Sequence, residues 1–201
     1  MKNKIVFAIL ALSTTAAFGA QRPYASTNDT YYSSAMPKAQ AIGYLVDEHV
    51  PGESDLGIGV RGWWGIPNSP FFLHGEYQTV GDIDQLRIGG GAVGPIQNNL
   101  MWIGKLEYID FSPDFGSDES GFGLHGGLLL NATPQLGLFG TLGYLDTDHT
   151  DGLELDLGGQ FHLSRELSLV GDFRTYHGDV DGPGGNFNIR DLRFGVAYTF
   201  W

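Results

Sequence analysis

Alternation between apolar and polar residues dominates the chain from about residue 41 to the C-terminus. In LGIGVRGWWG (56–65) large apolar residues alternate with glycine or arginine, and in LELDLGGQFHL (153–163) leucine and phenylalanine alternate with acidic residues and glycine. A period of two is typical of β-strands, and no convincing amphipathic helix interrupts it. The pattern predicts ten antiparallel strands joined in sequence, at approximately 41–47, 55–65, 71–80, 85–94, 100–110, 121–131, 136–145, 152–163, 167–177 and 187–200.

The junctions between these strands are of two kinds, which alternate along the chain. IPNSP, PIQNN, TPQ and SRE are short and nearly free of acidic residues. The other kind holds fifteen Asp or Glu residues and no Lys or Arg, and comprises DEHVPGESD, VGDID, DFSPDFGSDES, DTDHTDG and HGDVDGPGGN. Because successive antiparallel strands reverse direction, junctions of one kind share one end of the sheet. We therefore expect one end with short junctions and few acidic residues, called the quiet end below, and one end with longer, strongly acidic junctions.

A tyrosine stands near the end of each strand that leads into an acidic junction, at Tyr44, Tyr77, Tyr108, Tyr144 and Tyr176. Tyrosine has an apolar body and a polar tip, so a ring of tyrosines suits the boundary between hydrocarbon and water. Four of the five share the apolar side of their strand, whereas Tyr176 falls on the other side unless a bulge intervenes. The ring favours an apolar side that faces lipid. A sheet that spans a bilayer must be a closed barrel, because its backbone polar groups have no water to bind and must pair with one another.

The last strand, LRFGVAYTFW, places Leu192, Phe194, Val196, Tyr198 and Phe200 on one face. Here residues 41–201 resemble the small OmpA- and OmpX-like β-barrels of the Gram-negative outer membrane, whose final strand commonly ends in alternating apolar residues and a terminal aromatic. Trp201 follows the alternating set, so this signal is displaced by one residue. The resemblance implies an all-β, transmembrane, antiparallel up-and-down barrel that is inserted by the barrel-assembly machinery. Ten strands are favoured, with eight as the alternative. The predicted interfacial aromatics are Tyr44, Tyr77, Tyr108, Tyr144, Tyr176, Tyr198, Phe200 and Trp201.

The N-terminus predicts export. Two lysines, an apolar run from Ile5 to Leu12 and then small residues have the layout of a cleaved signal peptide, with cleavage expected after Gly19. The apolar run is far shorter than the roughly 18 residues of a membrane-spanning helix. Residues 1–19 are then the signal peptide, 20–40 a flexible periplasmic lead-in and 41–201 the barrel. The formal charge of -12 excludes nucleic acid as a partner, and the absence of cysteine excludes disulfides.

If the apolar side faces lipid, the other side of each strand lines the lumen. It carries five cations and six anions, which are expected to pair because isolated charges in a narrow interior are costly. This predicted lumen charge network comprises Arg61, Glu76, Arg87, Lys105, Glu107, Glu154, Asp156, Asp172, Arg174, Asp191 and Arg193. It predicts either a filled polar core or the constriction of a narrow water-filled pore, since ten strands leave more room than eight. Lumenal glycines, among them Gly57, Gly59, Gly89, Gly91, Gly121 and Gly123, either enlarge the lumen or relieve crowding.

Function is less constrained than fold. We expect a structural or surface-interaction protein in contact with outer-membrane lipid and lipopolysaccharide; a narrow, weakly cation-selective pore is the alternative. An outer-membrane enzyme is less favoured, because the lumenal histidines His74, His125 and His162 lack an evident serine partner. A soluble exported barrel is also less favoured, because it would leave the signal peptide, the two unequal ends and the C-terminus without a common cause. No cofactor is predicted. The histidines of the acidic junctions, His49, His149 and His177, stand among carboxylates that can contact divalent cations. No metal site is assigned, because DTDHTDG lacks the glycine and the glutamate of a calcium loop.

Overall fold

The computed structural model describes residues 39–113, 118–180 and 185–200, and all of its regular structure is β-strand. None of these residues forms a helix long and apolar enough to span a membrane. The strands are β1 (Ala39–Val50), β2 (Glu53–Gly65), β3 (Phe71–Val80), β4 (Ile83–Gln97), β5 (Leu100–Pro113), β6 (Glu119–Asn131), β7 (Leu136–Thr147), β8 (Thr150–His162), β9 (Leu167–Val180) and β10 (Gly185–Phe200). Ten strands are confirmed. The predicted signal peptide and Trp201 lie outside the described residues, and β1 begins two residues before the predicted barrel boundary.

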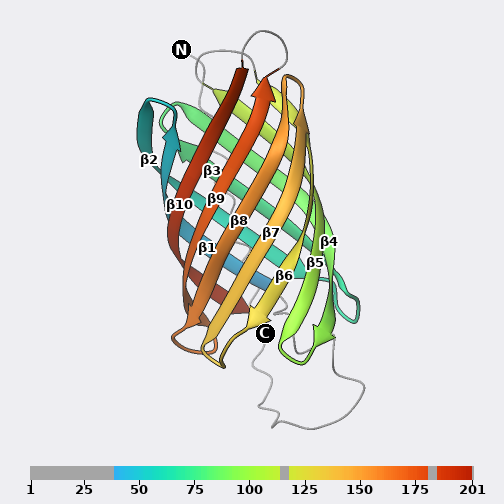
Figure 1. The fold of residues 1–201 in the computed structure, drawn as a ribbon. Helices are drawn as coiled ribbons and strands as arrows, with labels where there is room; N and C mark the ends of the chain where they lie inside the picture. The colour runs from blue at the N-terminus through green and yellow to red at the C-terminus, as the bar shows by residue number, and fades with distance from the viewer. Residues whose placement is uncertain (1–38, 114–117, 181–184, 201) are drawn as a thin grey trace.

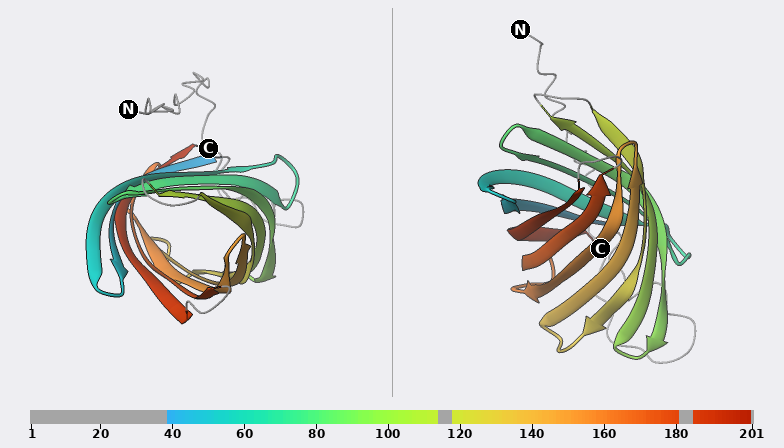
Figure 2. Two further views of the ribbon diagram at one scale, coloured as in Figure 1. Left: turned by 90° about the horizontal axis from the view of Figure 1, so that it is seen from above. Right: turned by 45° about the horizontal axis from the view of Figure 1, so that its top comes forward.

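Each strand pairs antiparallel with its neighbours in sequence, and β1 pairs with β10 to close the ring. The closing register runs from Ala39 opposite Phe200 to His49 opposite Arg190. Figure 1 shows the strands inclined to the barrel axis, and the view from above in Figure 2 shows the closed ring. A closed sheet has no free edge, so the backbone groups of every strand are paired within the barrel.

The two ends of the barrel differ in their turns. At the quiet end the connections are residues 66–70, 98–99, 132–135 and 163–166. At the acidic end, which we define by the junctions after β1, β3, β5, β7 and β9, three of the connections are two-residue turns: 51–52, 81–82 and 148–149. Gly52 and Gly81 have φ values of 94° and 54°, a conformation that glycine adopts without strain.

The prediction that the acidic junctions are long loops is therefore wrong for these three hairpins. Strand pairing continues beyond the point where the apolar alternation ends, as in Asp146 opposite Asp151 and Glu48 opposite Asp55. Backbone hydrogen bonds hold a hairpin together whichever side chains it carries, so a pattern based on side chains stops too early. Many carboxylates of the acidic end thus stand on strand ends.

Burial is inverted relative to a water-soluble protein. The outward side chains of Leu106, Leu124 and Leu142 are 57%, 66% and 57% exposed, whereas the lumenal Glu107 and Arg193 are 1% exposed. A barrel with an apolar exterior and a charged interior suits a bilayer.

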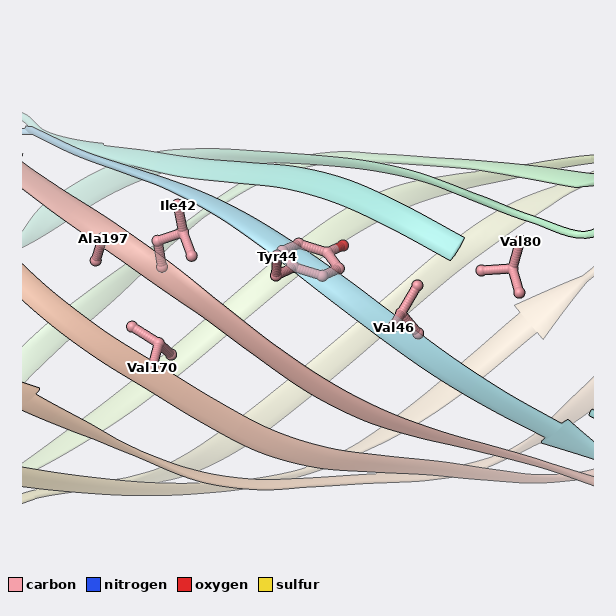
Figure 3. Close-up of a cluster of buried hydrophobic side chains, with 6 residues drawn as sticks. All are labelled: Ile42, Tyr44, Val46, Val80, Val170 and Ala197. Atoms are coloured by element: carbon pink, nitrogen blue, oxygen red, sulfur yellow. The ribbon is translucent and has the colours of Figure 1, made fainter. Parts of the chain in front are cut away.

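Strand β1 is apolar on both faces. Its Ile42, Tyr44 and Val46 point into the lumen, where they belong to a buried cluster with Val80, Val170 and Ala197 (Figure 3). The prediction that Tyr44 is an interfacial residue is therefore wrong.

The lumenal glycines leave little open space. A Cβ atom at Gly59 would lie 2.3 Å from Cζ of Tyr44, and one at Gly143 would lie 1.7 Å from Cδ2 of His125. A Cβ atom at Gly91 would similarly meet the ring of Phe72 at 2.6 Å. Neighbouring rings occupy the volume that these glycines vacate. These glycines therefore relieve crowding, the second of the two roles predicted for the lumenal glycines.

We expect Gly59→Ala to destabilise the barrel by about 1–3 kcal/mol, because the added methyl group overpacks the ring of Tyr44. Equilibrium unfolding in urea, followed in detergent micelles, measures the loss. Gly43→Ala is the matched control, because a Cβ atom at that outward position has nothing within 4 Å. If Gly59→Ala costs as much in a Tyr44→Ala background as in the native chain, contact with Tyr44 is not the cause.

Candidate functional site: the lumen charge network

All eleven residues of the predicted network face the lumen, and each takes part in at least one ion pair. They come from seven strands: Arg61 (β2), Glu76 (β3), Arg87 (β4), Lys105 and Glu107 (β5), Glu154 and Asp156 (β8), Asp172 and Arg174 (β9), and Asp191 and Arg193 (β10). Alternation places them there, since every second residue of a strand points to the same face. The ion pairs form two groups.

The first group is centred on Arg87, which is 3% exposed. Its Nη1 donates to Oε1 of Glu107 at 3.0 Å and to Oε1 of Glu154 at 2.8 Å, and its Nη2 donates to Oε2 of Glu154 at 2.7 Å. The contact with Glu154 is thus bidentate, the strongest geometry available to a guanidinium and a carboxylate. Because β4 and β8 lie four strands apart around a ring of ten, this pair crosses the lumen.

Two histidines and a lysine surround the same carboxylates. Lys105 Nζ lies 3.0 Å from Oε2 of Glu107, and His74 Nε2 lies 3.2 Å from that oxygen. The ring nitrogens of His125 lie 3.4 Å from Glu107 and 3.3 Å from Glu154, without hydrogen-bond geometry to any described residue.

Glu107, His125 and Glu154 are the only described residues whose ligand atoms gather closely enough to hold a metal ion, all within 4.8 Å of one another. However, Arg87 already donates to both carboxylates and Lys105 contacts one of them. A divalent cation would meet two positive charges beside its own ligands. This donor set therefore suits ion pairing better than metal binding.

The second group joins β9 and β10 to β3. Arg174 Nη1 and Arg193 Nη1 both donate to Oε1 of Glu76, at 2.8 Å and 3.1 Å. Arg174 also donates to Oδ2 of Asp191 from Nε at 2.9 Å and from Nη2 at 2.6 Å. The contacts to Glu76 cross the lumen, because β3 lies four strands from β9 and three from β10.

Two further carboxylates complete this second group. Arg193 donates to Asp172 from Nε and to Asp156 from Nη2, the latter at 3.1 Å. Arg61 Nη2 lies 2.6 Å from Oδ2 of the same Asp172. Arg174 and Arg193 are therefore each shared among several carboxylates, and the pairing extends from β2 round to β8.

Neutral side chains that the sequence analysis did not assign also belong to the site. Gln78 and Gln85 accept hydrogen bonds from Arg174 Nη2 at 3.0 Å and 2.9 Å. The ring of Tyr44 lies 5.8 Å from the guanidinium carbons of both Arg61 and Arg193, within the range of a cation–π contact. Alternation along β3 and β4 places both glutamines on the same lumenal side as the charged residues. The sequence could therefore have identified them, but the predicted network included charged residues only.

Of the predicted interfacial aromatics, Tyr77, Tyr108, Tyr144, Tyr198 and Phe200 lie on the outer surface and are 38–50% exposed. Tyr176 is 5% exposed and lies in the lumen with Ile109 and Leu145, as its position on the other side of the strand indicated. The prediction that Tyr176 is interfacial is therefore wrong, as it is for Tyr44.

One lumenal histidine has a serine partner that sequence reasoning missed. His162 Nδ1 lies 2.8 Å from Oγ of Ser168, which is its cross-strand neighbour on β9. Ser168 is fully buried, and no described carboxylate contacts His162 to orient its ring. A nucleophile needs access to substrate, so this pair has the character of a packed hydrogen bond.

Comparison with known proteins establishes the fold. No family model matches the chain, and no curated protein matches it. Among solved structures, the NanC porin superposes with a TM-score of 0.53 at 11% identity, covering 79% of this chain and 100% of the porin. The KdgM porin in complex with disordered oligogalacturonate gives a TM-score of 0.50 at 11% identity, covering 80% of this chain and 99% of that one. The chain therefore has the closed β-barrel fold of these porins.

Proposed function

We propose that the protein is an integral outer-membrane barrel whose lumen is closed by its own ion pairs, and that it has a structural or surface-interaction role. One observation carries the proposal: buried arginines on β4, β9 and β10 reach across the lumen to Glu154 and Glu76. Guanidinium groups that pair with carboxylates of the opposite wall occupy the interior at the level where a pore would have its constriction. Ion conductance through the folded barrel in a planar bilayer tests this role.

The outward side of the acidic end is the proposed contact surface. Asp47, Asp110, Asp146 and Asp151 stand on the outer face of their strands, above the exposed tyrosines. Tyr108 donates to Asp110, and Tyr144 donates to Asp151. Carboxylates at the level of the headgroups are suited to divalent cations that bridge them to the phosphates of lipopolysaccharide. Export through a cleaved signal peptide and insertion by the barrel-assembly machinery belong to the same proposal.

A narrow, weakly cation-selective pore is the second candidate. It is favoured by the fold shared with two porins and by the carboxylates of the acidic end, whose field would concentrate cations at the mouth. A pore would show discrete current steps, which a closed lumen would not. No catalytic role is proposed, because His74 and His125 face carboxylates already held by Arg87 and Lys105.

The lipid-facing assignment has its own test. We expect Leu142→Arg, at the middle of β7 on the outer face, to destabilise the barrel in phospholipid bilayers by about 2–4 kcal/mol. Asp146→Arg, on the same face but at the acidic end, should cost no more than about 1 kcal/mol. Urea unfolding in vesicles measures both variants. Equal costs at the two positions would mean that this face does not lie against hydrocarbon.

A further inference from the structure

The outer ring of tyrosines is interrupted at one sector of the acidic end. Tyr77, Tyr108 and Tyr144 are exposed on the outer face, whereas Tyr44 on β1 and Tyr176 on β9 are buried in the lumen. Strand β10 lies between β1 and β9 in the closed sheet. Among the described residues, the sector formed by β9, β10 and β1 therefore has no outward tyrosine at its acidic end, and other side chains stand at this boundary.

The apolar outer face of each of these three strands ends at a definite residue. Phe173 on β9, Leu192 on β10 and Leu45 on β1 are 37%, 43% and 65% exposed, and no large apolar side chain follows them on the outer face of their strands. The next outward residues are polar: Thr175, Arg190 and Asp47. A lipid-facing surface ends where the hydrocarbon ends, so the polar residues of this sector lie beside lipid headgroups.

Arg190 is the only Lys or Arg on the outer face of the acidic end among the described residues. The five cations of the lumen charge network point inward, and Arg165 lies in the turn 163–166 at the quiet end. Arg190 is exposed, and no described carboxylate forms an ion pair with it. A guanidinium presents five N–H donors in a fork that matches the oxygens of a phosphate. The donors of Arg190 are therefore available to a ligand from the membrane.

Four further hydrogen-bonding side chains surround Arg190 on the same face. His49 and Thr175 are its direct cross-strand neighbours, and Asn188 and His177 form the adjoining pair. Side chains directly opposite one another have Cβ atoms about 5 Å apart. Thr175 donates to Oδ1 of Asn188 at 3.0 Å, a bond that does not use the amide Nδ2 of Asn188, and each imidazole keeps at least one N–H. We call these five residues the donor patch: His49, Thr175, His177, Asn188 and Arg190.

Two carboxylates lie close to the donor patch and limit its positive charge. Asp47 Oδ1 lies 3.6 Å from Nδ1 of His49, and Asp179 stands two residues beyond His177 on the outer face of β9. The field around the patch is therefore weak, and it does not attract anions over a long distance. An anion that binds here must be brought to the patch by other means and then held by direct hydrogen bonds, above all with Arg190.

We propose that the donor patch binds the phosphate of an anionic lipid of the surrounding leaflet without a divalent cation. The apolar surface below the patch supplies the other means, because acyl chains packed against Phe173 and Leu192 bring a headgroup to Arg190. The inference rests on the proposed function in that the acidic end stands among lipid headgroups. It adds a direct contact at one sector, whereas the carboxylates of the other sectors need a bridging cation.

Native mass spectrometry of the full chain, released from micelles that contain phosphatidic acid and EDTA, tests this contact. Phosphatidic acid presents a phosphate monoester, and EDTA removes divalent cations. We expect one phosphatidic acid to be retained per barrel, and Arg190→Gln to lower the retained fraction about fivefold, the effect of one cation beside an anionic lipid surface. Arg165→Gln removes the same charge at the quiet end and should retain the lipid like the native chain.

Three outcomes in EDTA would overturn the proposal. These are the absence of retained lipid, unchanged retention in Arg190→Gln, and an equal loss in Arg165→Gln, which would indicate a response to net charge alone. Retention that appears only after Mg²⁺ is added would also contradict the donor patch, because the carboxylates would then hold the lipid through the metal ion. Failure of the closed lumen is a separate result, since current steps from the native chain would leave lipid retention unaffected.

A second variant keeps the test decisive if Arg190→Gln does not fold, which heat-modifiable gel mobility shows. Asn188→Leu removes one donor of the patch without changing its charge, and we expect it to lower the retained fraction. Unchanged retention in a folded Asn188→Leu protein would place the lipid elsewhere on the barrel.

Discussion

Replacing Glu154 with glutamine is expected to destabilise the barrel by about 3–5 kcal/mol, the largest stability effect of any single substitution we predict. Glu154 is 2% exposed and accepts hydrogen bonds from both Nη atoms of Arg87. The amide of glutamine keeps the shape but removes the charge, so Arg87 would keep only Glu107 as a partner in a buried environment. Urea unfolding in micelles measures the loss of free energy.

The control for this prediction is Glu119→Gln, a partly exposed acid on β6 at the acidic end, whose loss should cost less than about 1 kcal/mol. A double variant, Arg87→Met with Glu154→Met, should recover much of the stability, because two apolar side chains of similar size leave no unpaired charge. If Glu154→Gln is as mild as the control, water screens the pair and the lumen is wetter than the contacts indicate.

Replacing both Arg87 and Glu154 by small residues should open the lumen. We expect Arg87→Ala with Glu154→Ala to give discrete current steps in planar bilayers, because it deletes the bidentate bridge between β4 and β8. The current should favour cations. Four cations and five anions of the network remain.

The matched control removes one positive and one negative charge from the outer surface, by Arg190→Ala with Asp146→Ala. Both residues are exposed, so this variant should behave like the native barrel. The absence of current steps from a folded Arg87→Ala, Glu154→Ala protein would show that other side chains close the lumen. Current steps in both double variants would point to a general loosening of the barrel.

Most of the fold could be predicted from the sequence because two signals coincide along the chain. The period of two identifies strands, and the alternation between acidic and quiet junctions identifies their direction. The same period assigned all eleven charges to the lumen. These are local properties of strands, and a strand retains them wherever it stands in the barrel.

The remainder depends on contacts that no strand contains by itself. Glu154 lies across the lumen from Arg87, and Glu76 lies across it from Arg174, so these pairings depend on the register of strands that are not neighbours. Tyr44 was assigned to the lipid face because β1 is apolar on both faces, so apolarity cannot orient it. Its lumenal position follows from Gly59, which makes room for the ring on the neighbouring strand. The strand ends at the acidic end could not be predicted, because backbone pairing continues there beyond the last residue of the apolar–polar alternation.

The central claim is that buried ion pairs close the lumen of an outer-membrane barrel, and single-channel recording on the native chain tests it most directly. Folded protein, verified by heat-modifiable mobility, is inserted into a planar bilayer at a salt concentration of about 0.15 M, where exposed charges are partly screened but buried pairs are not. We predict a quiet baseline without discrete steps. Reproducible current steps of uniform size from the native protein would contradict the claim and favour the cation-selective pore.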